Sequence, residues 1–288
     1  MRGTIKTYYR LTKPGVLYGN VLTAAAGFLL AARGHVDIGL FVATIVGMTL
    51  VIAAACVLNN FLDQDIDQIM TRTKSRPSAL GEVKGSYMVI YSIVLLVLGT
   101  ATLAIGTNWL VVWIGLIGFG VYVWLYGALS KRRSIHGTLV GSISGAMPIV
   151  GGYAAVSGHV DAGFIIAFLI MFFWQFPEFY SIAIYRRKEY AAARIPVMSV
   201  VKGVRSTTIQ IFLYTILYVL STLALTVYGY TGYIYFVVMA VLGGYWIWLA
   251  YQGLRNPKPE VWARRMFKFS MITILALCVM LSIGPVLP

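Results

Sequence analysis

Three aspartates directly follow a long apolar stretch, in the segment NNFLDQDIDQIM at residues 59–70, although the chain has only nine acidic residues. Asn59, Asp63 and Asp67 recur every four residues, so a continued helix places them on one face and Asp65 on another. A solvated helix end is one explanation, but carboxylates at this spacing repel each other and oppose the helix dipole. The pattern therefore predicts cations nearby and favours a Mg²⁺ site, because this ion prefers hard oxygen ligands.

Basic residues follow the aspartates in the segment TRTKSRP. Arg72, Lys74 and Arg76 lie within ten residues of Asp67. Arginine binds phosphate oxygens with its planar fork, and lysine adds a point charge. Alone, these residues would be ordinary loop charges of a membrane protein. Beside the carboxylates they predict a site that holds Mg²⁺ together with a diphosphate group.

A second polar group interrupts the apolar segment FFWQFPEFYSIAIYRRKEY. It contains Gln175 and Glu178, and Pro177 between them is expected to kink the helix. An acid within a membrane span indicates a functional site, whereas the alternative is a structural pair with a neighbouring arginine. Glu178 and Glu189 are eleven residues apart, close to three helical turns. Both are therefore expected to face one cavity if the helix continues.

Membrane helices must position these residues, because the composition excludes a soluble protein. The 288-residue chain is 59% hydrophobic and 11% charged, with a mean hydropathy of +0.82, whereas a soluble domain carries about 25% charged residues. No polar linker divides the chain and no cleavage site follows the first apolar stretch, so one domain with a retained first helix is expected. Stretches of about 20 apolar residues, enough to cross a bilayer, predict nine spans at 16–32, 39–58, 86–106, 109–128, 138–157, 163–184, 207–229, 231–250 and 266–286.

The positive charges predict how these spans are oriented. All 23 Lys and Arg residues except Arg33 fall on one side when successive loops are assigned to alternate sides. The positive-inside rule makes this side cytoplasmic, with the N-terminus there and the C-terminus opposite. The formal net charge of +14 is thus explained by topology and by attraction to anionic lipid of the bilayer, and it does not indicate a nucleic-acid partner.

Four segments resemble the UbiA superfamily of membrane prenyltransferases, and the resemblance extends over nearly the whole chain. Within it they are most similar to the heme O synthase branch. The Asn59/Asp63/Asp67 motif alone indicates the superfamily, whereas RTKSRP and WQFP are typical of the heme branch. The segments are LTKPGVLYGN at 11–20, NNFLDQDIDQIMTRTKSRP at 59–77, KRRSIHGTLVGSISGAMPIVGGY at 131–153 and WQFPEFYSIAIYRRKEYAAARIPV at 174–197.

The resemblance implies an all-α membrane protein with nine helices around a central cavity. It implies transfer of a farnesyl group from farnesyl diphosphate to a vinyl group of heme B, which gives heme O, in a bacterial cytoplasmic (inner) membrane. A heme-modifying or oxidase-assembly enzyme is the implied candidate partner. The site residues carried over are Asn59, Asp63 and Asp67 for Mg²⁺ and catalysis, Glu178 for catalysis, Gln175 and Glu189 with Glu178 as a second polar cluster, and Arg72, Lys74 and Arg76 for the diphosphate. Lys131, Arg187 and Lys202 are further candidates for the diphosphate or the heme propionates, because they lie on the same predicted side of the membrane.

The sequence departs from the family pattern at three positions. Glu178 stands where the family usually has histidine, Glu189 where it has aspartate, and Gln64 where it has arginine. The first change replaces a base that titrates near neutral pH, and that is also a candidate iron ligand, with an anion. A carboxylate can still act as a base or stabilise a cation, so the change is compatible with catalysis.

Two other functions fit parts of the pattern. A UbiA-type prenyltransferase that acts on an aromatic quinone precursor predicts the same dependence on the aspartates but no heme binding. A secondary transporter also has many spans with acids in its helices, yet it is expected to have ionisable residues at the midplane and broken helices in repeated halves. Here most acids cluster at the cytoplasmic ends, with Glu178 as the exception, which favours the prenyltransferase.

Overall fold

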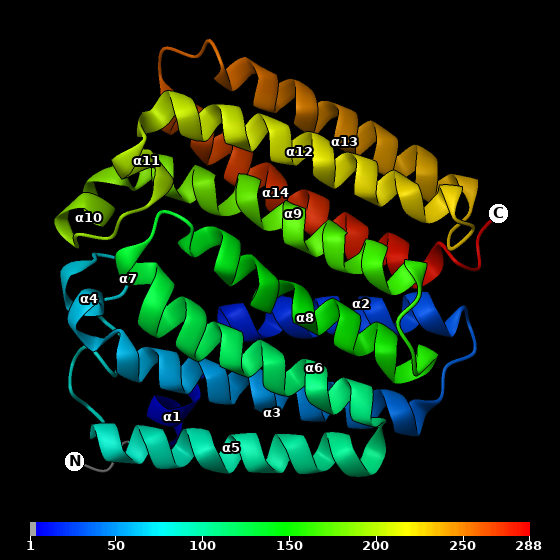
Figure 1. The fold of residues 1–288 in the computed structure, drawn as a ribbon, viewed down its shortest axis with the longest axis horizontal. Coiled ribbons are helices and arrows are strands. Elements are labelled where there is room, and N and C mark those ends of the chain that lie inside the picture. The colour runs from blue at the N-terminus through cyan, green and yellow to red at the C-terminus, as the bar shows by residue number, and fades with distance from the viewer. Residues whose placement is uncertain (1–3) are drawn as a thin grey trace.

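The computed structural model describes residues 4–288, and this part of the chain contains nine helices long and apolar enough to cross a bilayer. All nine predicted spans are confirmed, and Figure 1 shows the helices lying side by side. They are α2 (Pro14–Ala32), α3 (Ile38–Leu62), α5 (Gly85–Gly106), α6 (Trp109–Gly120) with its continuation to Arg133, α8 (Gly137–Ser157), α9 (Ala162–Tyr185), α12 (Gly203–Val227), α13 (Tyr233–Gly253) and α14 (Pro259–Ile283).

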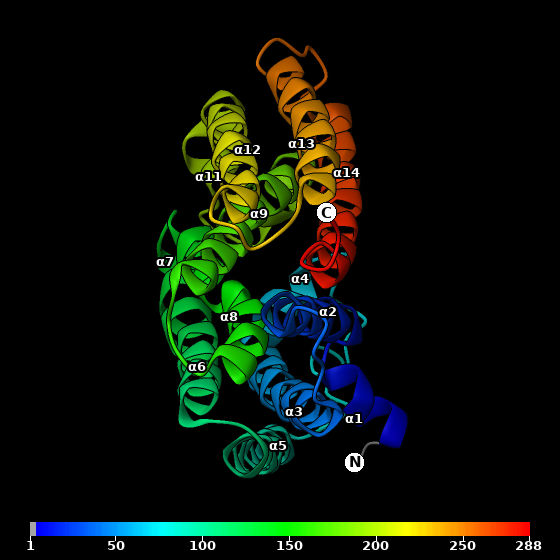
Figure 2. The same ribbon diagram turned by 90° about the vertical axis from the view of Figure 1, so that its right-hand side faces the viewer.

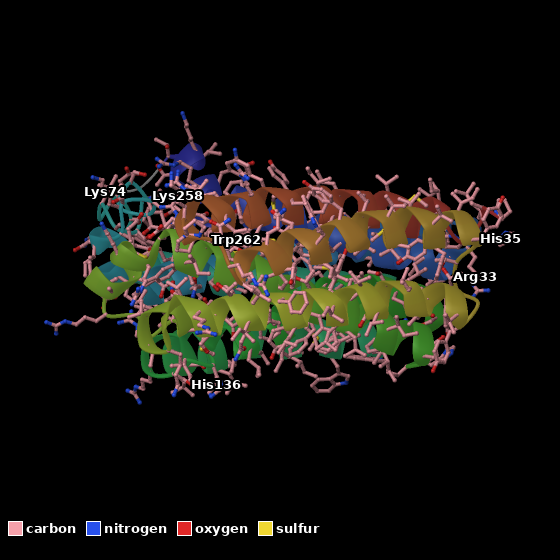
Figure 3. The ribbon with its side chains drawn as sticks, turned by 90° about the horizontal axis from the view of Figure 1, so that it is seen from above. Arg33, His35, Lys74, His136, Lys258 and Trp262 are labelled. Carbon is pink, nitrogen blue, oxygen red and sulfur yellow. The ribbon has the colours of Figure 1, made fainter. Side chains whose placement is uncertain are left out.

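Side-chain caps begin three of these helices at the same end of the bundle. Asp37 accepts a hydrogen bond from the backbone of Leu40 at the start of α3, at 2.9 Å. Asn108 does the same at the start of α6, and Asp161 at the start of α9. Each cap satisfies a backbone N–H that has no partner within the helix. Arg33 and His35 lie at this end, and Lys74 and Lys258 lie toward the other (Figure 3).

Six of the nine spans surround a central cavity. Its lining residues come from α2, α3, α6 with its continuation, α8, α9 and α14. Figure 2 shows these helices around the middle of the bundle, with α5, α12 and α13 toward its periphery. The arrangement therefore leaves an interior space that one large ligand, or two together, can enter.

Short helices gather at the basic end of the bundle, where they cover the cavity. One precedes α2, and the others belong to the loops after α3, α6 and α9 (Figure 1). Ile66 and Met70 of the first loop pack against Ala193 and Ile195 of the last in a small separate apolar cluster. These short elements are α1 (Ile5–Leu11), α4 (Gln64–Ile69), α7 (Lys131–Arg133), α10 (Arg187–Ala192) and α11 (Met198–Val201).

Glycines let α2 and α8 pack with their backbones in contact. A Cβ atom at Gly152 would lie 1.8 Å from the carbonyl oxygen of Ala24, and one at Gly27 would lie 1.9 Å from that of Ile149. Small residues allow such close approach between membrane helices, where packing replaces the hydrophobic effect as the main attraction. The α2–α8 pair therefore forms a rigid wall of the cavity.

We expect Gly152→Ala to separate α2 from α8 and to lower the free energy of unfolding by about 1–3 kcal/mol. The matched control is Gly244→Ala, because a Cβ atom there meets nothing within 4 Å. That change should be neutral or slightly stabilising, since alanine favours helix. Thermal unfolding of the two variants in one detergent measures the difference. Equal melting temperatures for both would contradict the close contact.

Candidate active site

The central cavity has a volume of about 770 Å³, within the range of roughly 300–1,000 Å³ for small-molecule sites. It follows α3 from Met48 to Asp63, which at 1.5 Å per residue is about 22 Å. Charged side chains line the end at Asp63, whereas apolar side chains such as Ile114, Met171 and Ile274 line the rest. This division suits a ligand with a charged head and a long apolar body.

Asn59, Asp63 and Asp67 lie together at the charged end. Helix α3 stops at Leu62 and α4 begins at Gln64, yet the backbone hydrogen bonds from Asp63 to Asn59 and from Asp67 to Asp63 continue the four-residue ladder. All three side chains line the cavity and are at most 2% exposed. The interruption between α3 and α4 therefore leaves the three side chains on one face, as their four-residue spacing predicts.

Two cations neutralise the buried aspartates. Arg76 lies 2.8 Å from one oxygen of Asp67 and donates to the other at 3.0 Å. Lys131 donates to Oδ2 of Asp63 at 2.6 Å. Both aspartates are nearly inaccessible, so these contacts replace the hydration that burial removes.

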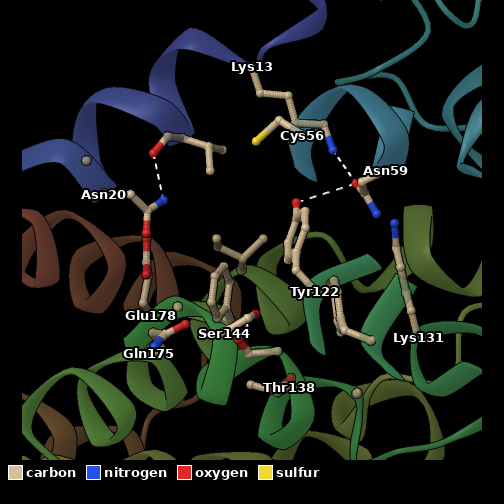
Figure 4. A pocket seen from close by; sticks show the side chains of 18 of the residues that line it. Lys13, Asn20, Cys56, Asn59, Tyr122, Lys131, Thr138, Ser144, Gln175 and Glu178 are labelled. Atoms are coloured by element: carbon tan, nitrogen blue, oxygen red, sulfur yellow. Dashed lines mark hydrogen bonds between the residues drawn. The ribbon is translucent and has the colours of Figure 1, made fainter. Parts of the chain in front are cut away.

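Lys13 is a third cation at this end, and the sequence motifs did not single it out. Its ammonium group donates to Oδ1 of Asn59, to which the hydroxyl of Tyr122 also donates at 3.4 Å (Figure 4). Lys13 has a left-handed φ of 52° directly before Pro14. Burial, helped by the nearby Arg76 guanidinium, lowers the pKa of Lys13 to about 8. The signal that the sequence offers is its place in the segment LTKPGVLYGN, directly before the proline that begins a helix.

Two buried polar atoms at the charged end of the cavity have no hydrogen-bond partner in the described part of the chain. Among residues 4–288, Oδ1 of Asp63 and Nδ2 of Asn59 are buried without a hydrogen-bond partner. No group of three His, Cys, Asp or Glu side chains forms a metal cage in this part of the chain. Mg²⁺ usually needs only one or two carboxylates, with water and phosphate oxygens as its other ligands. The free carboxylate oxygen of Asp63 therefore fits this ion, whereas the free amide nitrogen of Asn59 is a donor that suits a phosphate oxygen.

Asp65 points away from the cavity and braces the junction between α3 and α4. Arg132 donates to its two oxygens at 2.7 and 2.6 Å, and to the carbonyl oxygen of Leu62 at 2.5 Å. These hydrogen bonds lower the pKa of Asp65. Arg132 thus connects the last turn of α3 to the first turn of α4, and Asp63 lies between them.

The continuation of α6 is the π-helical segment η1 (Val121–Ser130). The N–H of Lys131 bonds to the carbonyl of Tyr126, five residues earlier. π-Helical turns are rare in proteins, and those that occur are often found at functional sites. Tyr122 and Tyr126 line the cavity with rings stacked at 5.8 Å, whereas Trp124 is 59% exposed on the outside.

The polar residues of α9 lie on a helix that stays continuous across Pro177. Gln175 is buried and donates to the carbonyl oxygens of Ser142 and Met171, at 3.1 and 2.9 Å. Glu178 lines the cavity, and no residue among 4–288 forms a hydrogen bond or ion pair with it. It points toward Asn20 of α2, away from Asn59 and Lys131 (Figure 4).

Glu189 does not share this cavity, which corrects the expected second cluster of Gln175, Glu178 and Glu189. Helix α9 ends at Tyr185, so the regular spacing from Glu178 is lost before position 189. Glu189 lies in α10 and pairs with Arg186 at 2.9 Å. Arg186 itself lines the cavity.

The remaining predicted basic residues divide into two groups. Arg72, Arg76 and Lys131 line the cavity. Lys74, Arg187 and Lys202 are exposed and are not among its lining residues. With Lys13 and Arg186, five basic side chains and three acidic ones line the cavity in the described part of the chain. The site therefore carries a surplus of positive charge, which suits an anionic ligand.

Known proteins share both the sequence and the fold. A family model described as the UbiA prenyltransferase family matches residues 20–272. A protein named protoheme IX farnesyltransferase from Yersinia enterocolitica is 46% identical, over 97% of this chain and 94% of the relative. A protein of the same name from Serratia proteamaculans is 45% identical, over 97% of this chain and 94% of the relative.

Two solved structures share the fold at much lower identity. One, reported for digeranylgeranylglyceryl phosphate synthase in membranes, has a TM-score of 0.82 at 18% identity and covers 98% of both chains. A UbiA homolog from Archaeoglobus fulgidus bound to DMAPP and Mg²⁺ has a TM-score of 0.70 at 16% identity, covering 96% of this chain and 99% of that one. The fold expected from the sequence resemblance is thereby confirmed.

The pairing of Arg76 with Asp67 can be tested by a double-mutant cycle. Arg76→Gln should lower the free energy of unfolding by about 3 kcal/mol, because it leaves a buried carboxylate without its cation. Adding Asp67→Asn should recover a large part of that loss, since the second change removes the uncompensated charge. Thermal unfolding in detergent measures all four proteins. Strictly additive losses would show that the two side chains do not depend on each other.

Proposed function

Because the chain belongs to the UbiA prenyltransferase family, we propose that it transfers the farnesyl group of farnesyl diphosphate to a vinyl group of heme B and forms heme O. The observation that carries this function is the division of the cavity, which follows α3 for about 22 Å, into a charged end at Asp63 and an apolar remainder. The extensive identity to proteins named protoheme IX farnesyltransferase supports the choice of substrates.

We assign the charged end to the diphosphate. Arg72, Arg76 and Lys131 line it and supply positive charge where the leaving group gains negative charge. Lys13 and Arg186 join them, whereas the exposed Lys74, Arg187 and Lys202 add only to the field at the entrance.

Asn59, Asp63 and Asp67 would hold Mg²⁺ at the same end. When bound, this ion supplies Lewis-acid stabilisation of the charge that develops on the diphosphate. Asp63 contributes the oxygen that has no hydrogen-bond partner. Lys131 and Arg76 keep the two carboxylates oriented toward the cavity.

The apolar length would receive the farnesyl chain and the heme. The allylic carbon–oxygen bond breaks with its electron pair on the diphosphate, the vinyl group forms the new carbon–carbon bond, and water adds to the resulting cation with loss of a proton. The faces of Tyr122 and Tyr126 can stabilise the allylic cation. Surrounding apolar side chains exclude stray water that would capture it.

Glu178 would orient the water that completes the reaction, or accept its proton. Its carboxyl group lines the cavity with no partner among the described residues, on the far side from Lys131. A carboxylate can take this proton. The histidine usual in the heme branch offers the same hydrogen-bonding function.

The arrangement also supports a membrane location and topology. We place the chain in a bacterial inner membrane with the charged end of the cavity on the cytoplasmic side, since 22 of the 23 Lys and Arg residues were assigned there. Both substrates have large apolar parts and can reach the cavity from the bilayer. Residues 1–288 would act as one domain, because six spans, from α2 to α14, line one cavity.

An aromatic quinone precursor is the alternative acceptor, and it would use the same diphosphate end. The names of the sequence relatives favour heme. A transporter is disfavoured by membership of a prenyltransferase family. Mass spectrometry of the tetrapyrroles after incubation with heme B, farnesyl diphosphate and Mg²⁺ separates these functions, because only the proposed reaction yields heme O.

We expect Asp63→Asn to lower heme O formation by about 10²-fold or more, as the loss of one preorganised charged group does in other enzymes. The matched control, Asp37→Asn, lies at the opposite end of the same helix, where an amide still caps the backbone. It should leave turnover unchanged. Product formation by Asp63→Asn at the normal rate, or undiminished product with EDTA, would remove the role given to Asp63 or to Mg²⁺.

We expect Glu178→His to keep or raise heme O formation, because imidazole also accepts a proton and is the usual group in the family. Glu178→Leu should lower it, since no polar group would remain at that wall of the cavity. Glu260→His, at an exposed position in the first turn of α14, controls for the substitution itself. The same mass-spectrometric assay measures all three. Full activity of the leucine variant would exclude a chemical role for Glu178.

A further inference from the structure

A second groove lies on the outside of the bundle between α13 and α14. Its volume is about 340 Å³. Aromatic rings of Tyr245, Trp248 and Phe269 line it together with two basic side chains, Arg265 and Lys268. Figure 2 shows α13 at the periphery of the bundle with α14 beside it. The groove is therefore accessible from the surrounding bilayer.

Helix α14 separates this groove from the active-site cavity. Arg265, Lys268 and Ile272 follow the helical spacing of three and four residues and line the groove. Phe267 and Met271 line the central cavity from another face of the same helix. The two basic residues therefore have no part in the proposed transfer reaction.

The positive charge of the groove has no counterpart in the protein. Arg265 and Lys268 are exposed, and neither forms an ion pair or a side-chain hydrogen bond within residues 4–288. Like charges one helical turn apart repel each other, which destabilises the helix unless an anion lies between them. The polar side chain of Gln252 on α13 lines the same groove and can donate to such an anion.

The position of the groove along the bundle indicates a lipid. The 25 residues of α14 span about 37 Å, longer than a hydrocarbon core of about 30 Å, so its first turns reach the headgroup region. Tyr and Trp are enriched at this level, and long basic side chains extend to it. Ile272 and Val279 continue from the groove along α14 and are both more than half exposed, as a surface against an acyl chain requires.

We propose that the α13–α14 groove binds an anionic phospholipid. Its phosphate lies between Arg265 and Lys268, and one acyl chain follows Ile272 along α14. Basic pockets between membrane helices at the positive side recognise anionic headgroups in this way. The aromatic rings of Tyr245 and Trp248 border the glycerol region.

Native mass spectrometry of the detergent-purified full chain, titrated separately with phosphatidylglycerol and phosphatidylcholine, tests the proposal. The wild-type protein should retain phosphatidylglycerol in preference. The double variant R265Q/K268Q should bind it roughly thirtyfold more weakly, at about a factor of five for each basic residue near the membrane surface. The control R255Q/K258Q removes two exposed charges at the same end, outside the groove, and should weaken binding far less than R265Q/K268Q does.

Equal binding of the two lipids, or an equal loss in the control variant, would overturn the proposal, because either would indicate diffuse attraction in place of a site. Displacement of bound phosphatidylglycerol by millimolar inorganic phosphate would also overturn it and assign the groove to a soluble anion. Heme O formation by R265Q/K268Q in detergent should equal that of wild type, which shows that the variant is folded. Lipid binding and heme O formation are therefore measured independently, so that either proposal can fail without the other.

Discussion

The structure depends on the neutralisation of two aspartates that are buried inside a bundle of membrane helices. A buried carboxylate without a partner costs several kcal/mol, so Asp63 and Asp67 are tolerated only beside cations. Lys131 comes from the end of the helix that begins with α6, and Arg76 from the loop after α4. These two contacts therefore bring separate parts of the chain to the same end of the cavity and close it.

The same contacts account for the character of the site. Because the cations that hold the aspartates also face the cavity, they are available to an anionic ligand without a large rearrangement. The positive surplus is confined to one end, whereas the remaining length is apolar. Charge separation during the breaking of a diphosphate ester needs this division, since the anion and the carbocation are stabilised by opposite surroundings.

Hydropathy and charge spacing predicted the nine spans and the common face of Asn59, Asp63 and Asp67, because both depend on local sequence. Inward faces of membrane helices are harder to recognise, since lipid and protein interior are both apolar. Tyr122 and Tyr126 line the cavity through a π-helical turn that their spacing does not show. Glu189 was misplaced because the end of α9 at Tyr185 interrupts a pattern that reads as continuous helix.

Asp63 and Glu178 line one cavity but lie in different surroundings. Asp63 accepts a hydrogen bond from the ammonium group of Lys131, whereas Glu178 points toward Asn20 and forms no hydrogen bond or ion pair among residues 4–288. Environments that differ in this way separate the roles of paired acids in many enzymes. An imidazole and a carboxyl group share the ability to accept and return a proton. In the proposed reaction, this wall needs a hydrogen-bonding group that can exchange a proton, and both glutamate and histidine meet that condition.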